Sequence, residues 1–441
     1  MSHLSKSYRR PLPALVKKYF AGGDEHVDTW SPERLFEYHS EALRRIVTHA
    51  FQNNLFYRNK FTAAAVMPHS LQYPQDLAKI PFTTKDEIRS KPWVLLSVPK
   101  HTVSQIHVST GTTGGEEIYV PHTWEDLHVN NMSPAMRRLI PVGASDVVVN
   151  ALPYEMSSSG LAFHRTFQKS YGAMVVPAGK GGYYSTTERT LQASRDLGAT
   201  VLITTPSYAV MLAEAAQEKG LALSEIPLRF MWLTGEGCSS ALRERIERLW
   251  GVPAYFYYGS LEAGPIGIEC GARSGYHVAG GHVFVEIVDP ATGRLLAPGE
   301  IGEVVVTELT RVASPLIRYR TGDMGYQEET SCSCGVTLKK LVLRGRSGDQ
   351  IRIGDKTFGP YYLEQFLMEI PEVGNWYQFV LNSDRLLIRV EHATNAEPST
   401  KLAGAIASRF EFATGIKAVV EFTSDIPRTG GKTLRVLQPN H

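Results

Sequence analysis

The chain has 441 residues and a mass of 48.9 kDa, more than one hydrophobic core usually serves, so two or three domains are expected. Its composition, with 43% hydrophobic and 20% charged residues and a mean hydropathy of −0.16, is that of an ordinary soluble globular protein. The formal net charge of +2 argues against a partner bound mainly through charge, such as nucleic acid.

Targeting signals and cysteines point to the cytoplasm. The basic N-terminus lacks the apolar stretch of about 7 to 15 residues that a secretory signal needs. No run of about 18 apolar residues is present that could span a bilayer, so no membrane partner is expected. The four cysteines are too scattered for a disulfide framework and suit a reducing compartment.

The first two-thirds of the chain predict helices followed by an α/β domain. Apolar residues recur at helical spacing over about 31–62, which predicts an N-terminal helical cap. Between about 100 and 310, short apolar runs such as DVVVNAL, ATVLITT and LRFMWLTG alternate with amphipathic runs such as SYAVMLAEAAQEKG and SSALRERIERLWG. This alternation is typical of a mostly parallel sheet with helices on its faces.

The last third predicts antiparallel strands and a small second domain. The stretch HVFVEIVDPATGRLLAPGEIGEVVVTEL holds two strand-like runs joined by turn-rich segments, which indicates an antiparallel β subdomain on the parallel sheet. After the strand KKLVLRG comes the glycine-rich, charged segment RGRSGDQ, where we place the boundary. We therefore expect a large domain over 1–343, a hinge over 344–349 and an α+β domain over 350–441.

The segment STGTTGG, which starts at Ser109, is a candidate phosphate loop. It follows the alternating run VSQIHV, so it is expected in the turn after a strand, where glycines let backbone N–H groups converge on an anion. Such turns also arise for purely local reasons, and the segment alone leaves both interpretations open. The other candidate, TGGKT near the C-terminus, is not a P-loop because Ile426 stands where the first glycine belongs.

Five further motifs follow in order: LTGEG, YYGSLEAG, YRTGDMG, LRGRSGDQ and PRTGGK. Together they resemble the motif series of the acyl-adenylate-forming enzymes, and most closely that of the phenylacetate-CoA ligases. The resemblance extends through PFTTKDEIR, TTPSY and EIVDPATGRLL and so covers most of the chain. It implies a large N-terminal domain with a small mobile lid, and an ATP-dependent ligase that forms an acyl-AMP with release of pyrophosphate and then transfers the acyl group to a thiol.

The resemblance also implies roles for single residues. Glu262 would bind Mg²⁺, Ser260 would approach the α-phosphate, and Lys432 would enter the site for adenylation and leave it for the second half-reaction. Asp323 would accept hydrogen bonds from the ribose hydroxyls, and Arg346 would donate to ribose or phosphate oxygens. The remaining segments expected to line the nucleotide site contribute Glu236, Gly237, Tyr257, Tyr258 and Gly259.

The phosphate loop and the hinge both depart from the family pattern. Many adenylate-forming enzymes end the loop with a lysine, which by ungapped count falls at Glu117, although phenylacetate-type ligases commonly lack it. We expect Glu116 and Glu117 to point away and to begin the strand EEIYVPH. The β- and γ-phosphates would then be held by backbone N–H groups and hydroxyls of Ser109, Thr110, Gly111, Thr112, Thr113 and Gly114. At the hinge, Gly348 followed by Asp349 replaces the usual Asp or Lys.

Three cysteines and a histidine are candidate ligands of a structural Zn²⁺. Cys332 and Cys334 lie one residue apart, and Cys270 and His277 come from a separate loop, which together supply a tetrahedral Cys₃His set. Some phenylacetate-CoA ligase relatives carry a similar arrangement. His282 is a competing ligand, and unligated thiols in a turn are the alternative.

The acyl site is expected between PYEMSSSGLAFHR and the TTPSY and LTGEG segments. Apolar walls with a few hydroxyls suit an aryl acid, such as phenylacetate, benzoate or an amino- or hydroxybenzoate such as anthranilate, better than a fatty acid. A lone histidine in such a segment is more often an interior residue than a substrate contact. The candidate substrate-binding residues are Met156, Ser158, Phe163, His164, Tyr208 and Gly235.

The acceptor and the assembly are less directly encoded. The resemblance implies coenzyme A as the acceptor, with a carrier-protein thiol as the alternative, and it makes a homodimer the expected assembly. An inactive nucleotide-binding protein is a third hypothesis. It is disfavoured because Glu262, Asp323, Arg346 and Lys432 are all retained.

Overall fold

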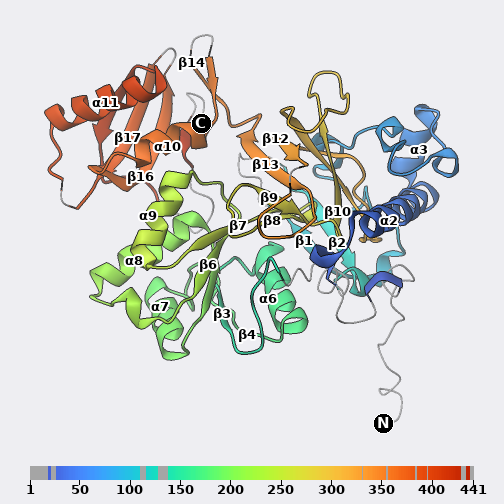
Figure 1. The fold of residues 1–441 in the computed structure, drawn as a ribbon, viewed down its shortest axis with the longest axis horizontal. Coiled ribbons are helices and arrows are strands. Elements are labelled where there is room, and N and C mark those ends of the chain that lie inside the picture. Colours follow the sequence, from blue (N-terminus) through green and yellow to red (C-terminus); the bar gives the residue numbers. More distant parts are fainter. Residues whose placement is uncertain are drawn as a thin grey trace.

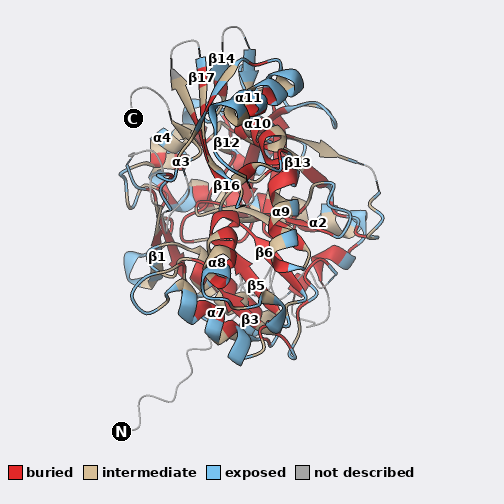
Figure 2. Ribbon diagram, turned by 90° about the vertical axis from the view of Figure 1, so that its left-hand side faces the viewer, coloured by how far each residue is buried: buried red, intermediate tan, exposed pale blue. Residues whose placement is uncertain are grey.

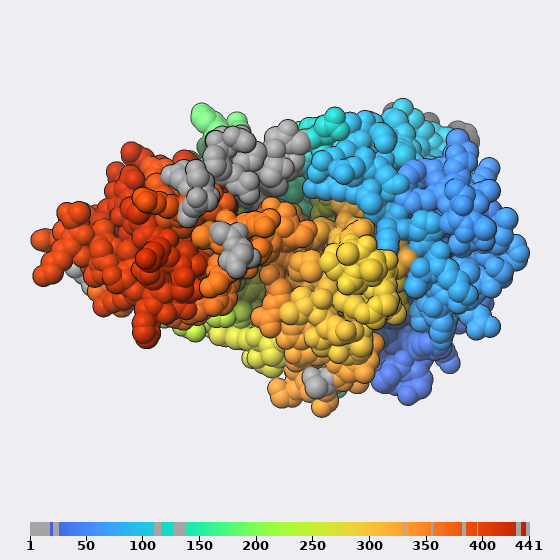
Figure 3. Space-filling model, turned by 90° about the horizontal axis from the view of Figure 1, so that it is seen from above, coloured from blue at the N-terminus to red at the C-terminus, as the bar shows by residue number. Residues whose placement is uncertain are grey.

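A computed structural model describes residues 18–20, 26–109, 116–127, 138–329, 331–353, 356–382, 385–394, 396–428 and 434–437. Within these ranges, none of the helices is both long enough and apolar enough to cross a membrane. The molecule is elongated, with the N-terminal helices at one end and the C-terminal domain at the other (Figures 1 and 3).

An 11-stranded sheet forms the centre of the molecule, in the order β10-β11-β12-β13-β9-β8-β7-β6-β5-β3-β4. The last five strands of that order are parallel to one another and the others are antiparallel. Figure 2 shows that most of this sheet is buried. The parallel strands are β4 (Met174–Val176), β3 (Val147–Asn150), β5 (Val201–Thr204), β6 (Phe230–Leu233) and β7 (Ala254–Ser260).

Helices cover both faces of the parallel half, as the alternation of runs predicts (Figure 1). Helix α6 (Ser159–Ser170) packs on one face, against β3 and β4. On the other face lie α7 (Thr187–Asp196), α8 (Pro206–Glu218) and α9 (Ser240–Trp250). The hydroxyls of Thr186, Thr205 and Ser239 each accept a backbone N–H at the first turn of these three helices, which fixes where they begin.

The predicted antiparallel strands are confirmed, and they continue the parallel sheet. Strand β7 pairs parallel with β6 on one side and antiparallel with β8 on the other, so it joins the two halves. The antiparallel strands are β8 (Gly264–Glu269), β9 (Tyr276–Val278), β10 (Val283–Val288), β11 (Gly302–Glu308), β12 (Tyr319–Glu328) and β13 (Lys340–Arg346).

The helical cap is two helices, where the periodicity predicts one segment over 31–62. Helix α2 (Pro32–Asn53) ends at Asn54, whose Oδ1 accepts the Tyr57 N–H and caps α3 (Leu55–Ala63). The Asn54 amide donates to Val94 O and Leu96 O at 2.9 and 3.1 Å. Contacts with a distant segment therefore stabilise the break.

Short elements connect this cap to the main sheet. The connecting helix α4 (Lys85–Ile88) is closed by a capping box between Thr84 and Glu87. Strands β1 (Val103–Val108) and β2 (Tyr119–Thr123) form a two-stranded antiparallel sheet on either side of the predicted phosphate loop. The 3₁₀ turns are η1 (Val27–Thr29), η2 (Pro68–Ser70), η3 (Leu77–Lys79), η4 (Lys100–Thr102) and η5 (Leu223–Glu225).

The C-terminal region is the predicted α+β domain. A hairpin leads into a four-stranded sheet in the order β18-β17-β16-β19, next to α10 and α11. Its elements are β14 (Ile351–Ile353), β15 (Lys356–Phe358), α10 (Pro360–Met368), β16 (Val373–Asn382), β17 (Arg385–His392), α11 (Thr400–Thr414), β18 (Ala418–Phe422) and β19 (Val436–Leu437). The domain packs on α9 through α10 (Figure 1).

Candidate functional site

A cavity of about 720 Å³ opens at the carboxyl ends of the parallel strands. Residues that follow β3, β5 and β6, and the last residues of β7, line it, which is where open α/β sheets bind ligands. Its wall includes ten residues predicted from the sequence: Ser109, Met156, Ser158, Phe163, Gly235, Tyr257, Gly259, Ser260, Glu262 and Arg346.

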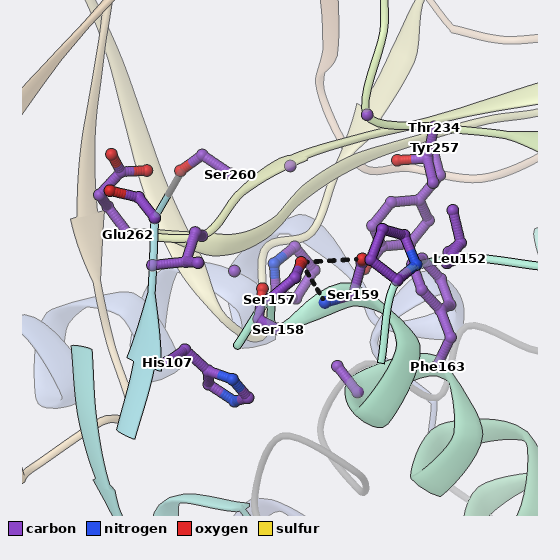
Figure 4. Close-up of a pocket in the computed structure, with 18 of the residues that line it drawn as sticks. His107, Leu152, Ser157, Ser158, Ser159, Phe163, Thr234, Tyr257, Ser260 and Glu262 are labelled. Atoms are coloured by element: carbon purple, nitrogen blue, oxygen red, sulfur yellow. Dashed lines mark hydrogen bonds between the residues drawn. The ribbon is translucent and has the colours of Figure 1, made fainter. Parts of the chain in front are cut away.

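Polar and apolar groups lie at different sides of this cavity. Figure 4 shows Ser260 and Glu262 on one side and Leu152, Phe163 and Tyr257 on the other. The segment Ser157–Ser159 lies between them, and the Ser157 and Ser159 hydroxyls are 3.1 Å apart. The cavity can therefore hold a polar group and an apolar body together.

The turn after β7 fixes Ser260 and Glu262. The Ser260 hydroxyl accepts the Ala263 N–H at 3.0 Å, and Arg311 donates to the Glu262 backbone oxygen at 2.6 Å. Both bonds hold the main chain while the Glu262 carboxylate stays in the cavity wall, with the residue 9% exposed. A carboxylate oxygen is the ligand type that Mg²⁺ prefers, so Glu262 fits the predicted metal role.

Asp323 and Arg346 are directly opposite each other on β12 and β13. Arg346 Nε donates to Asp323 Oδ1 at 2.8 Å, and the Tyr258 hydroxyl donates to Oδ2 at 2.5 Å. The Asp323 charge raises the pKa of Arg346, and burial raises the pKa of Tyr258 well above its ordinary value. Each carboxylate oxygen keeps a second lone pair that can accept from a ligand hydroxyl. Of these three residues, only Arg346 lines the cavity.

The GEG segment after β6 is held by three partners, Lys180, Ser207 and Tyr361. Glu236 pairs with Lys180 at 3.2 Å and accepts from the Ser207 hydroxyl at 2.8 Å. The Gly237 N–H donates to the hydroxyl of Tyr361 at 3.1 Å. A Cβ at Gly237 would come within 2.4 Å of the Tyr361 ring, so only glycine allows this approach between the two domains.

The predicted phosphate loop is described only at its two ends. Ser109 pairs with Ile118 through two bonds: its backbone N–H donates to Ile118 O at 2.9 Å, and its Oγ accepts the Ile118 N–H at 2.8 Å. Glu116 and Glu117 are exposed, and the strand begins at Tyr119, later than the sequence predicts. The predicted residues Thr110, Gly111, Thr112, Thr113 and Gly114, and the predicted catalytic Lys432, lie outside the described residues.

Two of the predicted acyl-site residues do not line the cavity. His164 follows Phe163 on α6, and its Nδ1 lies 3.1 Å from the Tyr154 hydroxyl. Tyr208 is 1% exposed inside α8, next to Gly181, which does line the cavity. Met156, by contrast, lines the cavity but is 60% exposed, so it lies toward solvent.

Several polar residues of the cavity wall were not predicted from the sequence. His107 and His122 pack edge to face, with ring centroids 5.1 Å apart, and burial lowers the pKa of both, to about 4 for His107, so they are neutral at pH 7. Lys85 and Lys180 add cations to the wall. The signal for Lys180 is the glycine-rich run PAGKGG directly after the strand GAMVV, at the same sheet edge as the predicted motifs.

The structure brings the four predicted zinc ligands together. Their ligand atoms, from Cys270, His277, Cys332 and Cys334, all lie within 4.8 Å of one another. His277 Nδ1 lies 3.0 Å from Leu338 O, and its Nε2 lies 3.2 Å from Cys334 Sγ. The Leu338 carbonyl fixes the proton on Nδ1 and leaves Nε2 as the metal-binding atom. His282 is not part of this group.

Family models match both parts of the chain. The "AMP-binding enzyme" model matches residues 38–310, and the "AMP-binding enzyme C-terminal domain" model matches residues 356–439. The chain belongs to the AMP-binding enzyme family. The phenylacetate-coenzyme A ligase of Thermus thermophilus is 34% identical over 83% of this chain and 82% of its own length. That of Escherichia coli is 32% identical over 93% of this chain and 96% of its own length.

Solved structures show the same fold for this AMP-binding enzyme. A 2-hydroxyisobutyryl-CoA ligase in its postadenylation state superposes with a TM-score of 0.86, at 21% identity, over 96% of this chain and 97% of that chain. The same ligase in its thioesterification state gives a TM-score of 0.67, over 93% of this chain and 91% of that chain, at 22% identity. The predicted fold class is confirmed. So is the enzyme class, an AMP-forming acid–thiol ligase that uses ATP and CoA.

Proposed function

We propose that this enzyme activates an aromatic carboxylic acid and transfers it to coenzyme A. The acid's carboxylate attacks the α-phosphate of ATP, which releases pyrophosphate and gives an aryl-AMP. The CoA thiol then displaces AMP to form the aryl-CoA. This reaction class is supported by similarity to phenylacetate-coenzyme A ligases, which align with more than four-fifths of the chain.

The observation that carries the proposal is the shape of the cavity. Leu152, Phe163 and Tyr257 form an apolar wall that a flat ring can contact, and Glu262 and Ser260 lie on the other side. An acid bound with its ring against the apolar wall presents its carboxylate toward Ser260. An anthranilate-CoA ligase bound to anthranoyl-AMP shares the fold, with a TM-score of 0.57 over 76% of this chain.

Electrostatic stabilisation is the main task in this reaction, because two anions meet. We assign Glu262 to a Mg²⁺ ion that would neutralise phosphate charge, and Ser260 to a hydrogen bond with the α-phosphate. Asp323 would hold the ribose hydroxyls, with Arg346 and Tyr258 fixing its orientation. Lys432 would supply the second positive charge, in addition to the hydrogen bonds from the loop that starts at Ser109.

The C-terminal domain would turn between the two half-reactions. We place the hinge at 344–349, although β13 runs through Arg346, so the described connection to β14 is residues 347–350. A Cβ added at Gly348 would meet no other atom within 4 Å, so the backbone there is free of local steric restriction. The higher TM-score with the postadenylation state than with the thioesterification state supports a distinct domain arrangement for each step.

We assign a structural Zn²⁺ to the Cys₃His group. Three sulfur atoms and a buried imidazole with a fixed tautomer match the donor set of a closed tetrahedral zinc site. Cys270 lies in the β8–β9 connection and His277 lies on β9, whereas Cys332 and Cys334 precede β13, the strand that pairs with β9. A bound ion would tie these segments together and contribute stability without taking part in the reaction.

An ATP-dependent acid screen tests the proposed function. Benzoate, phenylacetate, anthranilate, hydroxybenzoates and a fatty acid are each supplied with and without CoA, and acyl-AMP and acyl-CoA are measured by mass. We expect aryl-AMP without CoA and aryl-CoA with it. Aryl-AMP that accumulates without transfer to CoA would contradict the assigned acceptor, and activity on the fatty acid alone would contradict the assigned acid.

A further inference from the structure

Arg311 is a buried cation at the polar side of the cavity, next to the loop that carries Glu262. It is 3% exposed and lines the cavity wall, and its Nη2 donates to the Glu262 backbone oxygen at 2.6 Å. This bond places the guanidinium on the side where Figure 4 shows Ser260 and Glu262, opposite Phe163 and Tyr257. Arg311 belongs to none of the motifs that carry the family resemblance.

Two hydrogen bonds hold one peptide group beside the Glu262 carboxylate. Glu262 is the middle residue of the loop 261–263, which joins β7 to β8. The Ser260 hydroxyl accepts the Ala263 N–H, and Arg311 donates to the Glu262 oxygen. This N–H and this oxygen belong to the same planar peptide group, so the two bonds together fix its orientation. The direction in which the Glu262 side chain leaves the loop therefore depends on both.

Arg311 is itself held at both ends. Its Nε donates to Ser314 O at 2.9 Å, and the Ser314 hydroxyl donates to Pro121 O at 2.8 Å. Its backbone N–H donates to the Glu308 carboxylate at 2.5 Å. Because the guanidinium has a fixed place, it can determine the place of the loop 261–263.

Two buried acids compensate the charge of Arg311. Burial raises the pKa of Glu308 and of Asp126, and the Arg311 charge opposes this rise in both. An uncompensated cation here would repel a metal ion bound by Glu262. Since Glu308 and Asp126 offset that repulsion, Arg311 is able to act on Glu262 through geometry.

We infer that Arg311 is a positioning residue for Glu262, which holds the loop 261–263 in the orientation that lets the Glu262 carboxylate bind Mg²⁺. The inference rests on the proposed function and adds a residue to its first half-reaction. Mg²⁺ demands near-ideal octahedral geometry, so a carboxylate that is free to turn binds it less well. Arg311 therefore matters for acyl-AMP formation and not for transfer of the acyl group to CoA.

Nucleotide binding with and without metal tests this inference in the absence of turnover. Titration calorimetry measures the Kd of α,β-methylene-ATP, which cannot form an acyl-AMP, in Mg²⁺ and in EDTA. The ratio of the two values reports the coupling between metal and nucleotide. In Arg311→Met we expect this coupling to fall by about tenfold, while the Kd in EDTA stays within about threefold of wild type.

The sign of the effect separates position from charge. Loss of a positive charge alone would strengthen binding of a cation, so weaker coupling in Arg311→Met requires a loss of positioning. Arg311→Lys keeps a donor for the Glu262 oxygen and is expected to restore the coupling to within about threefold of wild type. If Arg311→Met does not fold, the double variant Arg311→Met/Glu308→Gln repeats the measurement with neither charge, and the same fall is expected.

The two half-reactions give a second readout. In Arg311→Met, pyrophosphate release is expected to fall by about tenfold or more, whereas transfer from supplied acyl-AMP to CoA, which expels no pyrophosphate, stays within about twofold of wild type. Arg229→Met is the matched control, because Arg229 donates to Pro141 O at 3.0 Å and pairs with Asp146 at 2.8 Å but does not line the cavity. It is expected to keep the wild-type coupling and both rates.

The outcomes separate this inference from the proposed function. Unchanged or stronger coupling in Arg311→Met, equal losses in both half-reactions, or an Arg311→Lys variant no better than Arg311→Met each overturn the role of Arg311 while the ligase assignment stands. If the wild-type enzyme forms acyl-AMP from none of the aryl acids, the proposed function fails, and the inference fails with it.

Discussion

Arg245 gives the sharpest test of the interface between the two domains. From α9 it donates to four backbone oxygens of the C-terminal domain: Met368 O at 2.7 Å, Ile370 O at 2.8 Å, Val373 O at 2.7 Å and Gly374 O at 3.1 Å. Burial lowers the pKa of Arg245 to about 10, so it stays charged at pH 7. One side chain therefore binds backbone oxygens at the end of α10 and at the start of β16.

We predict that Arg245→Met weakens docking of the C-terminal domain. Hydrogen bonds from charged donors contribute about 1.5–3 kcal/mol each, but the four carbonyls regain water when the domain undocks, so we expect a net loss of about 3 kcal/mol. This is roughly a hundredfold in the docking equilibrium. We propose that adenylation uses this docked arrangement, so its rate is expected to fall by about tenfold to a hundredfold.

The assay separates the two half-reactions. Pyrophosphate release reports adenylation, and acyl transfer from supplied acyl-AMP to CoA reports the second step, which is expected to stay within about twofold of wild type. Arg248→Met is the matched control, because Arg248 lies on the same helix with its side chain 66% exposed and 3.9 Å from Glu244. Equal losses in both half-reactions, or no loss in either, would refute the reasoning.

Three further predictions address the lysine, the metal and acid stability. Lys432→Ala is expected to slow acyl-AMP formation by about a hundredfold or more and to spare transfer from supplied acyl-AMP; unchanged acyl-AMP formation would remove its assigned role. Purified protein is expected to hold about one equivalent of Zn²⁺. The variant Cys332→Ser is expected to lose the ion and to have a melting temperature several degrees lower. Well under one equivalent of zinc in the wild-type protein would contradict the site. Burial opposes ionisation of Asp146, but hydrogen bonds from Thr200, Gly143 and Arg229 outweigh it and lower the pKa of that carboxyl. The resulting contribution to the free energy of unfolding is present above the unfolded pKa of about 4 and is lost as the pH falls below it. The variant Asp146→Asn is therefore expected to lose less stability than the wild type as the pH is lowered, measured by acid unfolding. Equal pH dependence of stability in the two proteins would count against the pairing.

Local patterns predicted the elements well where burial alone determines them. The strands of the parallel half are continuous apolar runs between amphipathic helices, so the alternation was sufficient to place them. The break at Asn54 was missed because helical periodicity continues across it and its cause is a contact with Val94 and Leu96, some 40 residues away. The strand β13 extends into the predicted hinge because Arg346 pairs with Asp323 across the sheet.

Site residues were predicted correctly where a motif determines the backbone conformation. They were predicted wrongly or missed where the direction of the side chain decides whether it lines the cavity. Glu262 and Ser260 follow directly from the turn after β7. Phe163 and His164 were predicted together, yet adjacent helical residues point about 100° apart, so only Phe163 lines the cavity. Lys180 lies outside the motifs, and its place in the wall depends on its pairing with Glu236 from another loop.

Isotope transfer tests the central claim of acyl-AMP formation most directly. The enzyme is given an aromatic acid whose two carboxylate oxygens are ¹⁸O, with Mg-ATP and CoA, and the products are read by mass. Attack of the carboxylate on the α-phosphate predicts aryl-CoA together with AMP that carries one ¹⁸O. Unlabelled AMP, or ADP with labelled phosphate, would contradict the account.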